Sequence, residues 1–304
     1  MISYDKFEKS IKNFSDVKVT RNFPTKNFVT FRAGGNADVF VEPNTVEALT
    51  RTIQAAKNHG IEYICVGGGS NLLVRDGGFR GIMICVSGIN NIKLCQNRIF
   101  AGCGARLSSV VSFSLANSLR GMEFCGGIPG TVGGGVFMNA GAYGGEIKDV
   151  ILSADVMDKN GQITTYDREM LGLSYRHSAI MENDGIITSA VFELINGDEN
   201  EGREILKELN RKRREKQPVD MPSAGSTFKR PQGYFAAALI ENAGLKGLSI
   251  GGAQVSKKHA GFVINTGGAS AKNIEDLTEL IKKRVYISSG VELSLEIKIV
   301  GEEL

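Results

Sequence analysis

A glycine-dense stretch from Glu123 to Glu146 has the composition in this sequence that points most clearly to chemistry. It reads E-F-C-G-G-I-P-G-T-V-G-G-G-V-F-M-N-A-G-A-Y-G-G-E and carries charge only at its two ends. Glycine lets a backbone approach another group without a Cβ in the way, at a cost in conformational entropy. A surface linker would be polar, whereas Ile128, Val132 and Phe137 favour burial. The stretch therefore predicts a buried loop whose backbone N–H groups face an anion such as a pyrophosphate.

A second glycine-rich turn, V-G-G-G-S-N, occupies residues 66–71. It lies between Ile61–Val66 and Leu72–Val74, two short apolar runs that are typical of strands. The chain lacks the G-x-x-x-x-G-K-[ST] phosphate loop, and neither glycine-rich segment gives G-x-G-x-x-G at the start of a helix. Each turn alone is equally compatible with a structural tight turn. Two such turns in one chain favour a nucleotide cofactor.

Length and charge place wide bounds on the function. A chain of 304 residues predicts about two domains at ~150 residues each. A hydrophobic fraction of 42% and a charged fraction of 23% are ordinary for a globular protein. The net charge of +3 permits an anionic small-molecule substrate and does not indicate nucleic acid. The basic run Arg211–Lys216 either contacts phosphates or forms a solvated helix face.

Cysteine and histidine usage does not indicate a metal site. The five cysteines form no C-x-x-C pair, and the three histidines are scattered along the chain. The spacing suits no metal, and an odd number of free thiols is typical of a reducing compartment. The N-terminus lacks an apolar core and no run reaches ~18 apolar residues. We therefore expect a cytoplasmic protein without a membrane segment.

Several regular elements are expected to hold these segments in place. Asn44 or Thr45 is predicted to cap a helix that ends near Asn58, before Gly60. The strand at 61–66 follows it. The remaining predicted elements of the first 200 residues are a strand at 81–86, a helix at 106–117 that leads into the glycine-rich stretch, and a hairpin of 154–158 with 162–166 around Asn160-Gly161.

A second domain is expected after a charged helix at 201–217, which Pro218 ends. It should hold helices near 235–242 and 272–286 and a final strand at 291–299. Strand parity places Val291, Leu293, Leu295, Ile297 and Ile299 on one face. Glu296 and Lys298 then share the other face, which is either solvated or lines a polar cleft.

Seven ordered motifs make the chain recognisable from end to end. They are F-R-A-G-G-N-A-D (31–38), V-G-G-G-S-N-L-L-V (66–74), G-G-I-P-G-T-V-G-G-G-V-F-M-N-A-G-A-Y-G (126–144), Y-R-H-S (175–178), A-G-S-T-F-K-R-P (224–231), V-S-K-K-H-A-G-F (255–262) and G-V-E-L-S-L-E-I (290–297). In these motifs the chain resembles the UDP-N-acetylenolpyruvoylglucosamine reductase family, in its shorter subtype.

The resemblance implies an α+β architecture, the vanillyl-alcohol-oxidase/PCMH-type FAD-binding fold with two α+β subdomains and a third α+β domain for the substrate. On this basis residues 1–200 are expected to form the FAD-binding domain, with a subdomain boundary near 95–100. Residues 201–304 are expected to form the substrate-binding domain, with the last strand packing back on the FAD-binding domain.

The resemblance also assigns both glycine-rich segments to FAD, with NADPH as the reductant. Some relatives in the wider superfamily attach FAD covalently through a histidine in the first turn. This turn has none, so a non-covalent flavin is expected. The residues expected to contact FAD are Val66, Gly67, Gly68, Gly69, Ser70, Asn71, Gly126, Gly127, Ile128, Pro129, Gly130, Gly133, Asn139, Ala140 and Gly141.

Three catalytic roles follow from the resemblance. Ser226 is expected to donate the proton, and Arg176 and Glu296 to stabilise an enolic intermediate. Arg176 offers a forked cation to the growing negative charge. A carboxylate would repel that charge, so Glu296 helps only when it is protonated or hydrogen-bonded. Without the resemblance, the sequence indicates that Ser226 is a turn residue and that Arg176 and Glu296 are solvated.

The implied substrate is UDP-N-acetylglucosamine enolpyruvate, reduced to UDP-N-acetylmuramate for peptidoglycan. Tyr175, Arg213 and Lys229 are the residues expected to bind it. Lys298 stands where the family commonly has Arg, and Lys loses the bidentate fork. No nucleic acid, membrane or protein partner is implied.

Two other functions use the same residues differently. An oxidase of a small alcohol or lactone would share the fold and react rapidly with O₂. A catalytically inactive flavin- or nucleotide-sugar-binding protein would be favoured by loss of Ser226, Arg176 or Glu296, and all three are present.

Overall fold

The computed structural model describes residues 4–11 and 15–304, which divide into two compact units. The first unit takes in the chain up to Arg21, Val39–Gly68 and Gly81–Lys212. The second takes in Asn22–Asp38, Gly69–Arg80 and Arg213–Leu304. Each unit therefore combines segments that are far apart in sequence.

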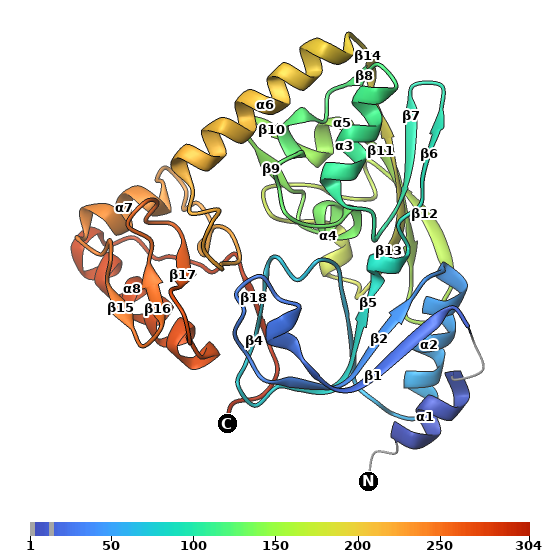
Figure 1. Cartoon of the computed structure of the whole chain (residues 1–304), viewed down its shortest axis with the longest axis horizontal. Coiled ribbons are helices and arrows are strands. Elements are labelled where there is room, and N and C mark those ends of the chain that lie inside the picture. Colours follow the sequence, from blue (N-terminus) through green and yellow to red (C-terminus); the bar gives the residue numbers. More distant parts are fainter. Residues whose placement is uncertain (1–3, 12–14) are drawn as a thin grey trace. The chain divides into compact units, whose positions relative to one another are not determined.

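A four-stranded sheet holds the early part of the chain, with the strand order β1-β2-β5-β3 (Figure 1). Its strands are β1 (Val17–Pro24), β2 (Asn36–Pro43), β3 (Tyr63–Val66) and β5 (Phe79–Cys85). Strands β3 and β5 pair in parallel. This arrangement confirms the strands predicted at 61–66 and 81–86, each with slightly shifted ends.

Helices α1 (Tyr4–Ile11) and α2 (Val46–Asn58) belong to the same part of the first unit. The Thr45 hydroxyl accepts a hydrogen bond from the Ala48 N–H and so caps α2, as predicted. Gly60 has a φ of +62° just after the helix, which is the left-handed conformation that commonly ends helices.

A five-stranded antiparallel sheet forms the rest of the first unit, in the order β12-β11-β13-β7-β6. Its strands are β6 (Ile92–Cys95), β7 (Arg98–Gly102), β11 (Ile151–Met157), β12 (Ile163–Asp167) and β13 (Ile186–Glu193). The predicted hairpin is confirmed, because β11 and β12 pair in antiparallel fashion and Gly161 has a φ of +84° in their turn.

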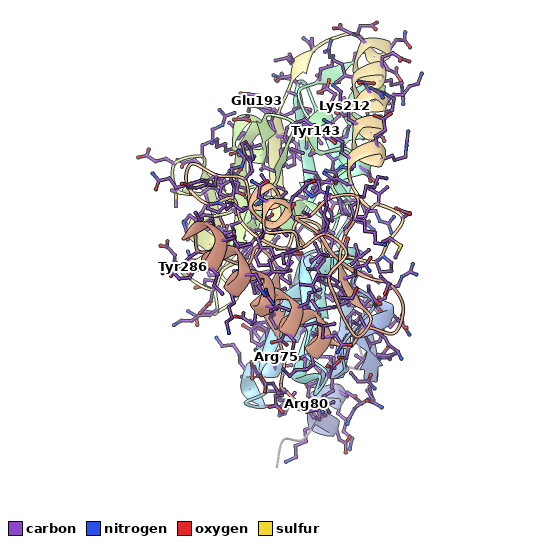
Figure 2. The ribbon with its side chains drawn as sticks, turned by 90° about the vertical axis from the view of Figure 1, so that its left-hand side faces the viewer. Arg75, Arg80, Tyr143, Glu193, Lys212 and Tyr286 are labelled. Carbon is purple, nitrogen blue, oxygen red and sulfur yellow. The ribbon has the colours of Figure 1, made fainter. Side chains whose placement is uncertain are left out.

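Helices, two short strand pairs and 3₁₀ turns complete this unit beside the larger sheet. They are α3 (Leu107–Ala116), α4 (Val132–Phe137), α5 (Ile147–Val150), the pair β8 (Leu119–Arg120) with β14 (Ile195–Asn196), the pair β9 (Gly141–Ala142) with β10 (Gly145–Glu146), and the 3₁₀ turns Val86–Gly88, Glu123–Cys125 and Ala179–Met181. One continuous apolar core runs from Phe7 to Leu194 through both sheets. Helix α6 (Glu199–Lys216) follows, and the division between the units falls inside it after Lys212, which is labelled in Figure 2.

The second unit contains the helices α7 and α8 and a small sheet (Figure 1). Helix α7 (Ala236–Asn242) and helix α8 (Ala271–Ser289) confirm the two predicted helices. Strands β15 (Ser249–Ile250), β16 (Ala253–Val255) and β17 (Val263–Asn265) form an antiparallel sheet. The 3₁₀ turn Thr25–Asn27 also lies in this unit.

The prediction of a long final strand is wrong. Only β18 (Lys298–Val300) is a strand, and it pairs in parallel with β4 (Leu72–Val74). Residues 291–297 contribute one isolated bridge, Phe228 with Leu295. The alternation of apolar residues persists there, since Leu293 and Ile297 are buried. Along 291–297 the neighbouring segments form only isolated hydrogen bonds with the chain. Regular strand pairing is therefore confined to residues 298–300.

The change from the first sheet to the second falls between Cys85 and Ile92, and residues 95–100 lie in the hairpin of β6 and β7. The functional domains, 1–200 and 201–304, stay a prediction.

Among residues 4–11 and 15–304, no helix combines the length and apolar character that crossing a bilayer requires.

Candidate active site

The two glycine-rich segments meet inside the first unit. A Cβ added to Gly67 would lie 2.3 Å from the Thr131 Oγ1, and one added to Gly68 would lie 3.7 Å from the Gly130 Cα. Only glycine at 67 permits this approach of the first turn to the second segment. The tertiary structure thus brings together two segments that sequence reasoning joined only through a shared cofactor.

The prediction of a buried loop with bare N–H groups is wrong for residues 132–137, which form helix α4. The Val132 N–H donates to the Ala105 carbonyl and the Gly133 N–H donates to the Cys103 carbonyl, both at 2.8 Å. Three consecutive glycines have poor helix propensity, so tertiary contacts decide this helix. A Cβ on Gly133 would lie 3.0 Å from the Cys103 Cβ, which explains the small residue.

The residues expected to contact FAD differ in their exposure. Gly67, Gly68, Ser70 and Asn71 of the first turn and Gly126–Ile128 and Gly130 of the second segment are half-buried, and Pro129 is exposed. Val66, Gly69 and Gly133 are buried. Gly67 and Gly68 meet Gly130 and the Thr131 side chain here. Glycine backbone in both segments fits a pyrophosphate, whose charge favours close N–H groups.

Asn139 lies just after α4 and is fully buried. Its amide nitrogen donates to the Glu146 carboxylate and to the Ser174 carbonyl, both at 2.9 Å. Its amide oxygen accepts from the Lys148 N–H at 2.9 Å. Both amide hydrogens of the Asn139 side chain are therefore donated to groups of the protein itself.

Tyr175 and Arg176 form the tip of a tight turn. The N–H and carbonyl groups of Ser174 and His177 bond to each other at 3.2 Å in both directions. Arg176 has a φ of +53°, an uncommon conformation for a residue with a side chain, and such residues cluster at functional sites. Its guanidinium lies 5.1 Å from the Tyr175 ring centroid and donates to the Gly141 carbonyl at 3.3 Å.

Ser226 lies in the second unit beside a residue that is firmly anchored. Thr227 is fully buried; its N–H donates to the Gly261 carbonyl at 2.9 Å, and its hydroxyl accepts from the Val263 N–H at 3.0 Å. Ser226 itself is half-buried and follows Gly225, whose φ is +74°. The backbone at Ser226 is thus fixed by its neighbour.

Glu296 is held between two other functional segments of the same unit. Its N–H donates to the Thr227 carbonyl at 2.9 Å, and its carbonyl accepts from the Asn71 side chain at 3.1 Å. The Lys298 N–H in turn donates to the Asn71 carbonyl at 2.9 Å. The first glycine turn, the Ser226 segment and the Glu296 segment therefore lie side by side.

The predicted substrate residues fall in different places. The Lys229 N–H donates to the Ser294 carbonyl at 2.8 Å, which places Lys229 beside the Glu296 segment. Lys298 is exposed. In the basic run of α6, Arg211 and Lys212 pair with Glu208 at 2.7 and 3.5 Å, whereas Arg213 is less exposed than either.

The described residues contain no group of three or more His, Cys, Asp or Glu that could hold a metal ion. His177 lies 3.4 Å from the Glu182 carboxylate. Burial lowers the pKa of His259, whose Nδ1 accepts from the Gly261 N–H at 3.2 Å. This bond supports the loop that anchors Thr227.

Sequence reasoning missed three supporting residues: Thr131, Glu146 and Thr227. Thr131 precedes a helix and accepts from the Gly134 N–H at 3.5 Å, and a threonine in that position is a known capping signal. Glu146 is one of only two charges in its glycine-rich stretch. Nothing in the sequence alone distinguished Thr227 from Ser226.

Comparison with known families explains this arrangement. A family model described as an FAD-binding domain matches residues 37–167. A second, described as the UDP-N-acetylenolpyruvoylglucosamine reductase C-terminal domain, matches residues 217–300. Together with the two glycine-rich segments, these matches define a flavoprotein with a mixed α+β fold, an FAD-binding domain and a reductase C-terminal domain.

Individual relatives are similar over nearly the whole chain. The UDP-N-acetylenolpyruvoylglucosamine reductase of Clostridium novyi (strain NT) is 48% identical over 302 residues, which covers 99% of this chain and 98% of the relative. That of Clostridium tetani (strain Massachusetts / E88) is 46% identical, with 96% and 95% covered. The crystal structure of UDP-N-acetylenolpyruvylglucosamine reductase from Thermus caldophilus is 32% identical, with a TM-score of 0.80 and 94% and 99% covered.

The chain belongs to the UDP-N-acetylenolpyruvoylglucosamine reductase family. Members of this family are oxidoreductases that use FAD and NADPH to reduce UDP-N-acetylglucosamine enolpyruvate in peptidoglycan synthesis.

Proposed function

We propose that this chain reduces UDP-N-acetylglucosamine enolpyruvate to UDP-N-acetylmuramate in the cytoplasm, with NADPH as electron source and Ser226 as proton donor. Two hydrogen bonds at Glu296 carry the proposal. The Glu296 N–H donates to the carbonyl of Thr227, next to Ser226, at 2.9 Å, and the Asn71 side chain of the first glycine turn donates to the Glu296 carbonyl at 3.1 Å. The five free thiols support a reducing compartment.

The cofactor is held without a covalent bond by the two glycine-rich segments, because no histidine lies in the first turn. When bound, the flavin supplies the hydride that adds to the CH₂ carbon of the enolpyruvyl ether. The other carbon of the double bond then requires a proton, so the reduction consumes one hydride and one proton and yields NADP⁺ overall.

The protein must stabilise negative charge on the substrate between these two additions. Arg176 carries a guanidinium on a constrained turn, which suits a carboxylate-bearing enolate. Glu296 contributes in its protonated form, because an ionised carboxylate would repel the intermediate. Ser226 then gives its hydroxyl proton to the carbon, which is basic enough to accept it.

The sugar nucleotide carries phosphates, and three residues are proposed to bind it. Lys229 lies beside the Glu296 segment, and Tyr175 is 42% exposed at the tip of the Arg176 turn. Arg213 begins the part of α6 that belongs to the second unit. No nucleic acid or protein partner is required by this function.

A visible spectrum followed by two anaerobic additions tests the function. The purified protein should show a flavin spectrum, NADPH should bleach it, and UDP-N-acetylglucosamine enolpyruvate should restore it in the absence of O₂. Restoration by the sugar nucleotide is the decisive step.

Two results would overturn the proposal. Rapid restoration by O₂ combined with no response to the sugar nucleotide would favour an oxidase of another substrate. A folded protein that binds FAD or the sugar nucleotide but transfers no electrons would be an inactive binding protein.

A further inference from the structure

Asn139 and Glu146 lie next to the turn that presents Arg176. The resemblance implies only an FAD contact for Asn139 and no role for Glu146. The turn is anchored at its base, where the Ser174 carbonyl accepts from the buried Asn139 amide at 2.9 Å. The same amide donates to the Glu146 carboxylate at 2.9 Å. Asn139 therefore links the Arg176 turn to the end of the glycine-rich stretch.

Glu146 is also tied to Arg176 through the small hairpin of β9 and β10. Gly141 pairs with Glu146 in this hairpin, and the Gly141 carbonyl accepts from the Arg176 guanidinium at 3.3 Å. The Glu146 carboxylate is only 27% exposed and pairs with the Lys148 ammonium at 2.9 Å. A negative charge is thus fixed on the hairpin that receives the guanidinium.

The ionisation of Glu146 agrees with this geometry. The pKa of Glu146 is lowered chiefly by the hydrogen bond from Lys148, against the opposing effect of burial, and further by Asn139 and by the positive charges of Lys148 and Arg176. The carboxylate therefore remains charged across the neutral pH range. Its charge interacts with Arg176 even though Lys148 supplies its nearest ammonium.

We propose that Asn139 and Glu146 are positioning residues for Arg176: Asn139 fixes the base of the turn, and Glu146 supplies a fixed charge that orients the guanidinium. The inference rests on the proposed role of Arg176 in stabilising the intermediate. It also gives the Asn139 side chain a task other than a contact with FAD, because both of its amide hydrogens are used.

Glu146→Gln tests the charge with little change of shape. In the FAD-loaded protein, reoxidation by the enolpyruvyl substrate should slow roughly 10- to 100-fold, the scale expected when a catalytic group is misplaced. Reduction by NADPH, flavin content and thermal midpoint should stay close to the parent values. Glu182→Gln is the matched control, because Glu182 is 72% exposed and lies near His177 of the same turn.

Arg176→Ala and the double variant separate the inference from the proposed function. If Arg176→Ala leaves reoxidation unchanged, the role of Arg176 and the inference both fall. If it slows reoxidation while Glu146→Gln behaves like Glu182→Gln, only the inference falls. In the Arg176→Ala background, Glu146→Gln should have little further effect, since coupled residues are non-additive. Undiminished slowing there would show that Glu146 acts independently of Arg176.

Asn139→Asp tests the proposed role of Asn139. It removes the donor to the Ser174 carbonyl and places a second carboxylate beside Glu146, so reoxidation should slow more than NADPH reduction. Equal slowing of both half-reactions in a folded, flavin-loaded variant would make Asn139 a cofactor or scaffold residue and would contradict the proposal for it.

Discussion

Ser226 and Thr227 are adjacent residues with hydroxyl side chains, and they differ in burial and in hydrogen bonding. Thr227 uses its N–H, hydroxyl and carbonyl in hydrogen bonds to two separate segments, one with Gly261 and Val263 and the other with Glu296. Ser226 is left half-buried beside it. Anchoring at the neighbour fixes where Ser226 lies without consuming its hydroxyl, which is the arrangement a proton donor requires.

Ser226→Ala should separate the two halves of the reaction. The variant should keep its flavin and be reduced by NADPH at nearly the parent rate, because the proton is needed only after hydride transfer to the substrate. Reoxidation by the substrate should slow by at least ~10²-fold, the effect typical of losing a general acid. Stopped-flow absorbance measures both steps, with Ser223→Ala as the control. Equal slowing of both steps would make Ser226 a structural or cofactor residue.

Arg213→Ala tests substrate binding at the same scale. Arg213 is half-buried, whereas its neighbours Arg211 and Lys212 are exposed and pair with Glu208. Arg213 is the residue of this run that we expect to bind the phosphates. Its removal should raise the KM for the sugar nucleotide more than it lowers kcat, the pattern of lost uniform binding. Lys212→Ala is the matched control and should change neither constant appreciably. An effect of equal size in both variants would contradict a specific role for Arg213.

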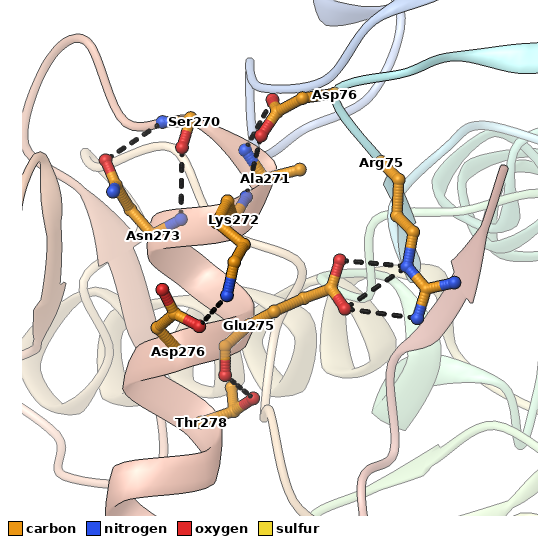
Figure 3. Close-up of polar contacts among 9 residues, drawn as sticks. All are labelled: Arg75, Asp76, Ser270, Ala271, Lys272, Asn273, Glu275, Asp276 and Thr278. Atoms are coloured by element: carbon orange, nitrogen blue, oxygen red, sulfur yellow. Dashed lines mark hydrogen bonds and ion pairs between the residues drawn. The ribbon is translucent and has the colours of Figure 1, made fainter. Parts of the chain in front are cut away.

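At the scale of elements, the start of α8 is secured by residues from a distant segment (Figure 3). The Asp76 carboxylate accepts from the N–H groups of Ala271 and Lys272, both at 2.8 Å. Arg75 binds both oxygens of Glu275 at 3.1 and 3.2 Å. Arg75 lies toward the N-terminal end of α8 and Tyr286 toward its C-terminal end (Figure 2). The segment after β4 thus holds the helix at its first turns.

Asp76→Ala should destabilise the protein through this helix end. Losing an acceptor for the first free N–H groups of a helix costs about 0.5–2 kcal/mol, and the favourable placement of a negative charge near the helix start is lost as well. Denaturant unfolding of the full-length protein measures the change. Asp276→Ala, which removes an exposed i,i+4 partner of Lys272 on the same helix, should cost ~0.5 kcal/mol or less. Equal losses would show that Asp76 acts as an ordinary surface charge.

The contact between the two glycine-rich segments can be tested with alanine at Gly67 and at Gly68. Gly67→Ala should lower the free energy of unfolding of the FAD-free protein by about 1–3 kcal/mol, as overpacking does, because the new Cβ would lie 2.3 Å from the Thr131 Oγ1.

Gly68→Ala is the comparison that isolates the cofactor. An added Cβ there meets protein atoms only at 3.7 Å or beyond, so the FAD-free protein should be nearly unaffected. FAD affinity should nevertheless fall, because the methyl group would occupy the space proposed for the cofactor. Unchanged FAD affinity in a titration of this variant would remove Gly68 from the cofactor site.

At the scale of the whole molecule, the chain combines an FAD-binding region and a reductase C-terminal region in one polypeptide. The family models match 37–167 and 217–300, and the charged helix α6 (Glu199–Lys216) lies between the two matches. We propose that residues 1–200 bind the cofactor and residues 201–304 bind the substrate. Segments 22–38 and 69–80 nevertheless belong to the same compact unit as 213–304, so the proposed domains interleave in the fold.

Release of the cofactor tests how the whole protein holds it. Acid or heat precipitation should leave free FAD in the supernatant, because no histidine lies in the first glycine turn to form a covalent bond. Absorbance of the supernatant and the pellet measures this directly. Flavin that remains with the pellet would show a covalent attachment at another residue.

The sequence by itself determined the local elements that have strong signals. The helix capped by Thr45, the Asn160-Gly161 hairpin and the two C-terminal helices depend on caps, turns and apolar periodicity, which act between neighbouring residues. The motifs also indicated the family, which the relatives confirm.

Only the tertiary structure decided how these pieces combine. It made a helix of the glycine-rich residues 132–137, because packing against Cys103 and Leu107 overrides weak intrinsic propensity. It limited the last strand to three residues, because a strand exists only where a partner pairs with it. It also brought Asn71, Thr227 and Glu296 together and linked Asn139 to the Arg176 turn. These contacts join residues far apart in sequence, and no local pattern encodes them.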